Sequence, residues 1–139
     1  MNEQLTEKSF KRHVAYKLRI GQILQGAPIF EDIKLKHVEI EGKSVSRINL
    51  IANVVDKFSQ EGEKKYGSLM LDDATGQIAV KFFGDGVAQL EEFQQGDTLL
   101  VIGLLRSWQN QIYITSEIIK KKDPEYLLIR KLEIEELLI

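Results

Sequence analysis

The sequence contains no cysteine and only two histidines, His13 and His37. The absence of cysteine excludes a disulfide framework and any metal site built on thiolates. The two histidines are too few and too far apart to form a zinc site by themselves, so we expect neither a metal nor another cofactor. No apolar run reaches the ~18 residues that a membrane-spanning helix needs, and no signal peptide is visible. These absences predict a soluble intracellular protein that does not contact membranes.

The sequence also lacks an excess of basic residues. It has 19 lysine and arginine residues against 21 acidic ones, which gives a formal net charge of −2. Proteins that bind nucleic acid indiscriminately usually carry a basic excess. A local basic face is still compatible with this balance, because the positions of the charges matter more than their sum. Any binding of single strands must then rest on base stacking and a few well-placed cations.

No catalytic motif is present in the sequence. There is no glycine-rich phosphate loop, no nucleophile elbow and no metal-ligand spacing. The adjacent Asp72 and Asp73 could indicate magnesium binding or acid–base chemistry. However, the D-D-A-T-G segment that ends at Gly76 has the composition of a type I turn, with aspartate at its start and glycine at its end. We therefore interpret the pair as part of a turn and expect no enzymatic activity.

The length of 139 residues fits one domain with short appendages. Residues 1–14 are polar and lack periodicity, so we expect a flexible N-terminal arm. Residues 15–44 predict an extension that packs on the main domain, with one strand, a helical turn and a hairpin turn at Glu41-Gly42-Lys43. Residues 45–119 form the expected main domain, and residues 123–139 form a C-terminal helix.

Five segments of the main domain have the patterns of strands. Four of them alternate apolar and polar residues, which is typical of half-buried strands, and the fourth in order is apolar on both faces, as expected where a barrel strand is also covered from outside. A helical pattern at residues 87–93 separates the third segment from the fourth, and Gly103 in the fourth fits a bulge or a sharp bend. This order predicts a mainly β fold, a five-stranded Greek-key barrel. The expected strands are residues 47–57, 66–72, 77–83, 98–106 and 111–117.

Aromatic and basic residues are expected together on one outer face of this barrel. Alternation along the third strand forces Lys81 and Phe83 outward. The fourth strand ends in a tight hairpin tip, Trp108-Gln109-Asn110. Such a face is suited to stacking nucleobases. The alternatives are that a loop covers Phe83 and that Trp108 packs on its own hairpin.

With these segments in order, the sequence resembles the middle subunit of replication protein A, the single-stranded-DNA-binding heterotrimer, and especially its archaeal form. The D-D-x-T-G turn alone also occurs in other oligonucleotide-binding barrels, but the ordered set closed by a C-terminal helix is much more specific. The resemblance implies an OB-fold barrel and places the protein in the cytoplasm of an archaeal cell, or in the nucleus of a eukaryotic one. The matching segments are residues 16–24, 45–55, 71–76, 96–97, 101–103 and 106–110.

The resemblance also implies which residues contact single-stranded DNA. The family has one stacking aromatic at the end of the third barrel strand and a second in the hairpin between the fourth and fifth strands. Phe83 and Trp108 occupy those places here. Lys81 and Arg106 are then expected near phosphates. The remaining candidates are Lys57, Lys64 and Lys65 at the rim of the groove, and Tyr66 and Tyr113 as secondary contacts.

The C-terminal helix begins with Asp123 as a good N-cap and Pro124 at the first helical position. Its apolar residues form two stripes roughly 100° apart, Leu127–Ile134–Leu138 and Leu128–Leu132–Ile139. One stripe suffices to dock on the barrel, so two indicate contact with other helices. The resemblance implies a three-helix bundle with the large and small subunits, and the expected interface residues are Tyr126, Leu127, Leu128, Leu132, Ile134 and Leu138.

Three features depart from the family pattern. Position 83 carries phenylalanine where eukaryotic members commonly carry tryptophan, and position 52 carries alanine where we expect glycine in archaeal relatives. No winged-helix module follows the helix in this sequence. Two alternatives stay open: a mainly structural subunit with little DNA binding of its own, and an RNA-binding barrel, because stacking discriminates poorly between sugar types.

Overall fold

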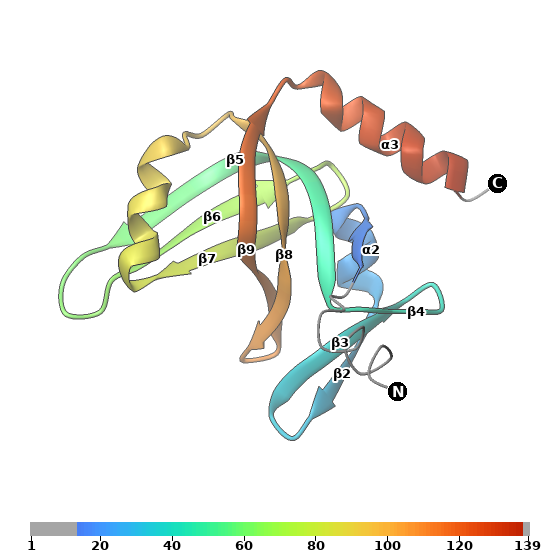
Figure 1. Cartoon of the computed structure of the whole chain (residues 1–139), viewed down its shortest axis with the longest axis horizontal. Coiled ribbons are helices and arrows are strands. Elements are labelled where there is room, and N and C mark those ends of the chain that lie inside the picture. The colour runs from blue at the N-terminus through green and yellow to red at the C-terminus, as the bar shows by residue number, and fades with distance from the viewer. Residues whose placement is uncertain (1–13, 138–139) are drawn as a thin grey trace, which may run out of the picture.

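The computed structural model describes residues 14–137. The arm expected at residues 1–14 lies outside this range except for Val14. Five long strands form a barrel, an N-terminal unit packs beneath one end of it, and a helix closes the chain (Figure 1). The barrel strands are β5 (Arg47–Gln60), β6 (Tyr66–Asp72), β7 (Gln77–Phe83), β8 (Thr98–Trp108) and β9 (Gln111–Lys122). The 3-10 helix η1 (Gly84–Glu92) connects β7 to β8. A mainly β barrel with a C-terminal helix is confirmed.

The barrel closes because β5 pairs with both β6 and β8. The sheet order is β1-β5-β6-β7-β9-β8, and β5 also pairs with β8. All pairs among the barrel strands are antiparallel except β7 with β9, which runs parallel. The alternating apolar residues of these strands point inward, as predicted, and they form one continuous core, against which the partly buried Ile112 of β9 packs. They include Ile48, Leu50, Ala52 and Val54 of β5, Leu69 and Leu71 of β6, Ile78, Val80 and Phe82 of β7, and Ile114 of β9.

The predicted bounds of β6 and β7 are confirmed to the residue, but the other three barrel strands and the connecting helix differ. β5 continues three residues further than expected, so Phe58 lies on a strand and not in a loop. β8 and β9 also extend, so the lysines at positions 120–122 belong to β9. These extensions no longer follow the alternating pattern, but their backbone groups still pair in antiparallel ladders, which the side-chain pattern does not reveal. The connecting helix starts three residues early and is a 3-10 helix.

Gly103 lies at a bulge, as predicted. The β8–β9 register shifts between Ile102 and Gly103. A Cβ atom at position 103 would lie 2.3 Å from the carbonyl oxygen of Thr115. Only glycine therefore allows the two backbones to approach this closely where the barrel bends.

The N-terminal unit consists of one strand, one short helix and a separate sheet. β1 (Ala15–Lys17) pairs in parallel with β5, and α2 (Ile20–Gln25) follows. A three-stranded antiparallel sheet comprises β2 (Ala27–Glu31), β3 (Lys34–Ile40) and β4 (Lys43–Val45). The predicted hairpin turn is confirmed, since Glu41 and Gly42 both have positive φ and join β3 to β4. β2 was not anticipated, because every one of its residues is exposed and the strand shows no buried face.

The D-D-A-T-G segment is a turn, as predicted, but it also anchors α2. Asp72 Oδ1 accepts a hydrogen bond from the Ala74 backbone N–H at 2.7 Å, and the positive φ of Ala74 (76°) does not fit type I. Asp73 is buried, and its Oδ2 accepts the backbone N–H of Ile20 at 2.8 Å. Thr75 Oγ1 accepts the next backbone N–H, that of Gly21, at 2.8 Å. Two of the free N–H groups at the start of α2 are thus satisfied by a turn more than fifty residues away.

The C-terminal helix α3 (Glu125–Leu137) packs on the barrel partly through a charged residue. Arg130 is buried, and its guanidinium donates to the backbone oxygen and to Oδ1 of Asn49 on β5. Glu133 accepts hydrogen bonds from Arg130 at 3.4 Å and from Lys17 of β1 at 2.7 Å. Burial lowers the pKa of Arg130, and the hydrogen bond from Lys17 lowers the pKa of Glu133. Within residues 14–137, neither this helix nor any other is long and apolar enough to cross a membrane.

Candidate nucleic-acid interface

The outer face of β6 and β7 is a regular array of paired side chains. The antiparallel register places Tyr66 opposite Phe83, Ser68 opposite Lys81, Met70 opposite Ala79 and Asp72 opposite Gln77. All of these residues alternate with the buried residues of the same strands, so they face away from the core. The array is aromatic at the end near η1 and small or polar at the end near the β6–β7 turn.

Three aromatic rings are neighbours at the aromatic end of this array, those of Phe58 on β5, Tyr66 on β6 and Phe83 on β7. The rings of Phe58 and Tyr66 have centroids 6.0 Å apart, and those of Tyr66 and Phe83 have centroids 5.4 Å apart. Phe58 is 50% exposed and Phe83 is 54% exposed. The alternative that a loop covers Phe83 is therefore excluded among the described residues. Phe58, Tyr66 and Phe83 thus form a row of aromatic side chains on three adjacent strands, which we call the aromatic row.

Phe58 was not among the residues selected from the sequence. Strict alternation along β5 places even-numbered residues such as Val54 inside, and it would place Phe58 there too. A register shift between Val54 and Asp56 inserts one extra residue, so Asp56 pairs with Met70 and Phe58 pairs with Ser68 on the outer face. A bulge of this kind reverses the facing of everything that follows it. The only sign in the sequence that Phe58 has a special place was that it is an aromatic residue at the start of the otherwise polar segment 58–65.

Lys81, Tyr113 and Arg106 come together beside the aromatic row, on three different strands. The ammonium of Lys81 lies 4.3 Å from the centroid of the Tyr113 ring, a cation–π contact. Tyr113 pairs with Arg106 across the β8–β9 ladder, and Arg106 is exposed. This group places two cationic side chains and one further aromatic ring next to the aromatic row.

Trp108 lies at the tip of the β8–β9 hairpin, where it pairs with Gln111. The two tip residues, Gln109 and Asn110, both have positive φ, as a two-residue type I′ turn requires. The Trp108 side chain is 63% exposed, so most of the indole does not pack on its own hairpin. In Figure 1 the hairpin projects below the barrel, on the side to which the β2–β3 hairpin also extends.

The remaining predicted cations do not all reach this face. Lys57 Nζ donates to the backbone oxygen of Phe93 at 3.0 Å, which ties β5 to the residue after η1. Because Lys57 pairs with the inward-facing Leu69, it lies on the opposite face of β5 from Phe58. Lys64 and Lys65 are exposed in the β5–β6 loop, next to the aromatic row.

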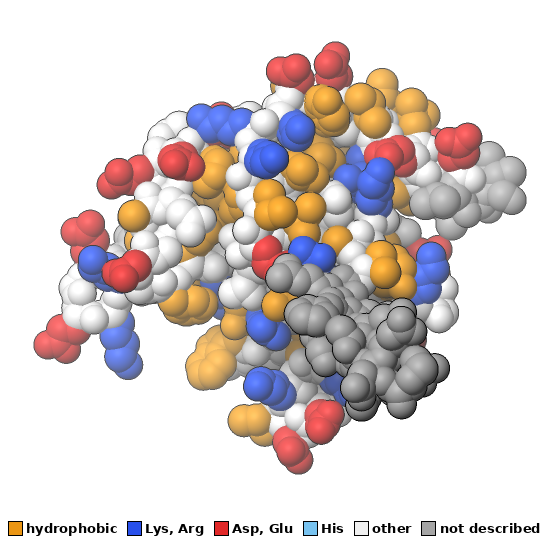
Figure 2. Space-filling model, viewed as in Figure 1, with side chains coloured by type: hydrophobic (Ala, Val, Ile, Leu, Met, Phe, Trp, Pro, Cys, Tyr) orange, Lys and Arg blue, Asp and Glu red, His pale blue; other side chains and the backbone are white. Residues whose placement is uncertain are grey.

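The predicted interface residues of α3 lie on two different faces of the helix. Ile134 is buried and Leu127 is half-buried. Leu127 lines a hollow with residues of β5 and Ile134 lines one with residues of the N-terminal unit, so this stripe docks on the rest of the chain. Leu138 lies outside the described residues. The other face is open and adds Ile129 to the predicted set. Figure 2 shows hydrophobic side chains gathered over α3, and the exposed ones are Tyr126, Leu128, Ile129 and Leu132.

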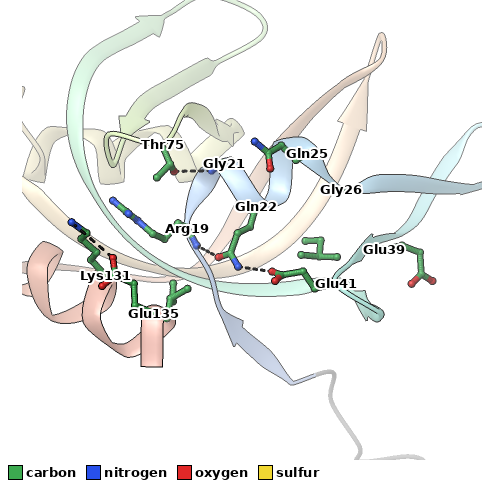
Figure 3. Close-up of a pocket in the computed structure, with 12 residues that line it drawn as sticks. Arg19, Gly21, Gln22, Gln25, Gly26, Glu39, Glu41, Thr75, Lys131 and Glu135 are labelled. Atoms are coloured by element: carbon green, nitrogen blue, oxygen red, sulfur yellow. Dashed lines mark hydrogen bonds and ion pairs between the residues drawn. The ribbon is translucent and has the colours of Figure 1, made fainter. Parts of the chain in front are cut away.

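A hollow of about 540 Å³ lies between α2, the β3–β4 hairpin and α3 (Figure 3). Its polar side chains bond to one another: Gln22 donates to Glu41 at 2.6 Å, and Lys131 lies 3.9 Å from Glu135. Within residues 14–137, no group of three histidine, aspartate or glutamate side chains is arranged to hold a metal ion. The hollow is a junction between these three elements.

Comparison with known proteins decides the family. Residues 38–122, which are more than half of the chain, match the family described as OB-fold nucleic acid binding domain. The chain belongs to this family. The matched residues contain all five strands of the OB-fold barrel, and therefore the aromatic row and the hairpin tip. An uncharacterised protein of Methanocaldococcus jannaschii is 31% identical over 128 residues. That alignment covers 88% of this chain and 48% of the relative, so the chain spans about half the length of the curated protein it matches.

Solved structures show the same OB-fold. One chain of a replication protein A heterotrimer bound to single-stranded DNA superimposes with a TM-score of 0.72 at 22% identity, covering 91% of this chain and 97% of that one. A chain of the S. pombe Stn1–Ten1 complex gives a TM-score of 0.73 at 13% identity, with coverages of 91% and 94%. A chain of yeast replication protein A bound to single-stranded DNA gives 0.66 at 22% identity, with 88% of each chain covered. In the first two cases the likeness extends over nearly the whole of both chains.

Proposed function

We propose that this chain is the middle subunit of a replication protein A-like complex and binds single-stranded DNA. The observation that carries the proposal is the exposed aromatic row on the outer face of β5, β6 and β7, with Lys81 and Arg106 beside it. The similarity to chains of complexes described as bound to single-stranded DNA supports it. On this proposal the chain protects single strands during replication, repair and recombination.

Stacking supplies most of the binding free energy in this mechanism. One base stacks on Phe83 and another on Trp108, and each contact contributes ~1–3 kcal/mol in known stacking platforms. Tyr66 supports the ring of Phe83 from the neighbouring strand. Lys81 and Arg106 contact the phosphates between the stacked bases, and Lys64 and Lys65 approach the strand from the β5–β6 loop. Because every base has a flat face, this arrangement gives little sequence preference.

The small number of cations has a measurable consequence. Each neutralised phosphate of a single strand contributes about −0.7 to the slope of log affinity against log salt. With two to four phosphates contacted, we expect a slope between about −1.4 and −2.8. Matched DNA and RNA oligonucleotides at two salt concentrations test both this slope and the sugar preference. A clear preference for RNA would favour an RNA-binding OB-fold domain instead.

The decisive experiment removes the two stacking side chains. Phe83→Ala with Trp108→Ala should weaken binding of a fluorescent poly-dT oligonucleotide by about 25-fold or more, the product of two stacking losses near the low end of their range. Tyr126→Ala is the matched control, because Tyr126 is an exposed aromatic residue on α3, away from the outer face of β5, β6 and β7. Fluorescence anisotropy measures the affinity and circular dichroism checks the fold. Unchanged affinity of the double variant would reject the proposed site.

The open face of α3 favours a second role, assembly of the complex. Leu128 and Leu132 are more than half exposed on the side of the helix that faces away from the barrel. Apolar residues on both sides of a helix are expected where it packs between a domain and other helices. We propose that this face joins a three-helix bundle with the large and small subunits. A mainly structural subunit would keep this role and lose little if the aromatic row were removed.

Point substitutions test the assembly role more cleanly than deletion of the helix, because α3 also buries Ile134 beside the N-terminal unit. Leu128→Glu with Leu132→Glu should abolish co-elution with the large and small subunits in size-exclusion chromatography of co-expressed proteins. Ile33→Glu is the control, since Ile33 is 97% exposed on the β2–β3 hairpin. An intact complex with both glutamates present would reject the interface.

A further inference from the structure

A second hollow adjoins the proposed interface and is made by both parts of the molecule. It encloses about 500 Å³ between the outer face of β7 and β9 on one side and α2 and β2 on the other. Ala79 of β7 contributes a small side chain to its sheet side, between Met70 of β6 and Tyr113 of β9, with which it pairs. Leu24 and Pro28 of the N-terminal unit form the opposite wall. The volume lies in the range of small-ligand sites, about 300–1,000 Å³.

This hollow is continuous with the aromatic row along a single strand. Phe83, Lys81 and Ala79 are alternate residues of β7, so all three face the same side. Successive side chains on one face of a strand lie about 6.6 Å apart. A strand of nucleic acid that stacks on Phe83 and follows β7 therefore passes Lys81 and arrives at the hollow within about 13 Å.

The lining of the hollow suits one nucleobase. Leu24 and Met70 offer apolar surfaces to the faces of a ring, and the amides of Gln77 and Gln111 offer donors and acceptors to its edge. Gln77 Nε2 donates a hydrogen bond to Asp72 Oδ2 at 2.9 Å, and this bond fixes the orientation of the Gln77 amide. Lys81 lines the same hollow and carries its only charge among the described residues, so a phosphate at its mouth is attracted.

The contrast with the hollow of Figure 3 lies in the charges. Three glutamates line that hollow, together with Arg19 and Lys131. By contrast, none of the described residues that line the hollow beside β7 is acidic. Carboxylates repel the negatively charged backbone of a nucleic-acid strand. A wall without carboxylates next to the aromatic row therefore favours the binding of such a strand.

We propose that the hollow between β7 and α2–β2 holds one unstacked nucleobase of the single strand bound on the aromatic row. The inference rests on the proposed function and adds a binding site to which the N-terminal unit contributes. It assigns the α2–β2 segment a role in holding the strand as well as in packing on the barrel. Amides that reach the edge of a base also give this one position a base preference that stacking alone does not supply.

The experiment combines a filled hollow with abasic oligonucleotides. Ala79→Leu fills the hollow from the sheet side without changing an aromatic residue, and Ala88→Leu, at an exposed position of η1, is the matched control. A set of poly-dT oligonucleotides with one abasic site moved along the strand is measured against each variant by fluorescence anisotropy. For the wild-type chain, one abasic position beyond those stacked on Phe83 and Trp108 should cost about fivefold in affinity.

In Ala79→Leu, the unmodified oligonucleotide should bind about fivefold more weakly, and the abasic site at that position should no longer matter. Leu24→Glu, on the opposite wall, should give the same two results, so a folding defect of one variant does not decide the outcome. An unchanged abasic profile in both variants would overturn the nucleobase site, while sensitivity to Phe83→Ala with Trp108→Ala would leave the proposed function standing. Failure of the wild-type chain to bind any of the oligonucleotides overturns both.

Discussion

Two neighbouring carboxylates of the β6–β7 turn, Asp72 and Asp73, should differ sharply in their contributions to stability. Asp73 is buried and accepts hydrogen bonds from the backbone N–H of Ile20 at 2.8 Å, from the backbone N–H of Thr75 at 3.0 Å, and from the Thr75 hydroxyl. Asp72 is half-buried and bonds only to Ala74 and Gln77, which are exposed. Replacing each by alanine therefore tests a buried anchor against a turn residue in the same sequence motif.

The magnitude follows from the donors that each substitution leaves behind. In Asp73→Ala the N–H of the fully buried Ile20 loses its partner, which costs ~1–3 kcal/mol. The Thr75 donors belong to an exposed residue and can turn to water, so they add about 0.5–1 kcal/mol. The total is about 1.5–4 kcal/mol. Asp73→Asn keeps one acceptor oxygen and should cost about half as much. In Asp72→Ala both donors reach solvent, and the loss should stay below about 1 kcal/mol.

Urea unfolding followed by far-ultraviolet circular dichroism measures these differences. A change in the urea midpoint at constant slope reports stability alone. Hydrogen exchange localises the loss, because Asp73→Ala should first release the N–H groups of α2 while β8 and β9 stay protected. The reasoning is refuted if Asp72→Ala costs as much as Asp73→Ala, or if Asp73→Ala lowers the free energy of unfolding by less than about 0.5 kcal/mol.

Two further substitutions test other features of the fold. Gly103→Ala should destabilise the barrel by about 1–3 kcal/mol, because the added methyl group meets the Thr115 backbone 2.3 Å away and not a flexible side chain; a neutral effect in a thermal melt would contradict the close approach at the bulge. Glu133→Gln should cost at most about 1 kcal/mol at neutral pH, since the Lys17–Glu133 pair is partly exposed. The pKa of Glu133 is lowered in the folded protein, so its contribution is present above the ordinary value of 4.5 and is lost as the pH falls through the folded value. Thermal melts of the wild-type protein and of the Glu133→Gln variant should therefore converge in acid, and a difference that is constant from neutral to acidic pH would refute the role of the carboxylate.

The sequence by itself determined the strands that form the middle of the interface. β6 and β7 each have one face of apolar residues and one of mixed residues, and shifting either by one residue would expose its whole apolar set. Their bounds and the outward direction of Phe83 therefore follow from the pattern alone. Trp108 at the hairpin tip follows from the short polar turn between two apolar runs. The family of the chain could be predicted from the order of these segments.

Only the tertiary structure decided which further residue belongs to the aromatic row and which charged residues are buried. Phe58 reaches the aromatic row because a bulge after Val54 reverses the facing of β5, and a bulge leaves no mark in the alternation. Arg130 is buried because Asn49 on β5 offers it two acceptors, although helical periodicity alone gives no reason to bury a charge. The same holds for Asp73, whose anchoring of α2 depends on a contact across 53 residues of sequence. Local patterns specify which side of an element faces inward, whereas contacts between distant segments depend on how the elements pack, and packing is a property of the whole fold.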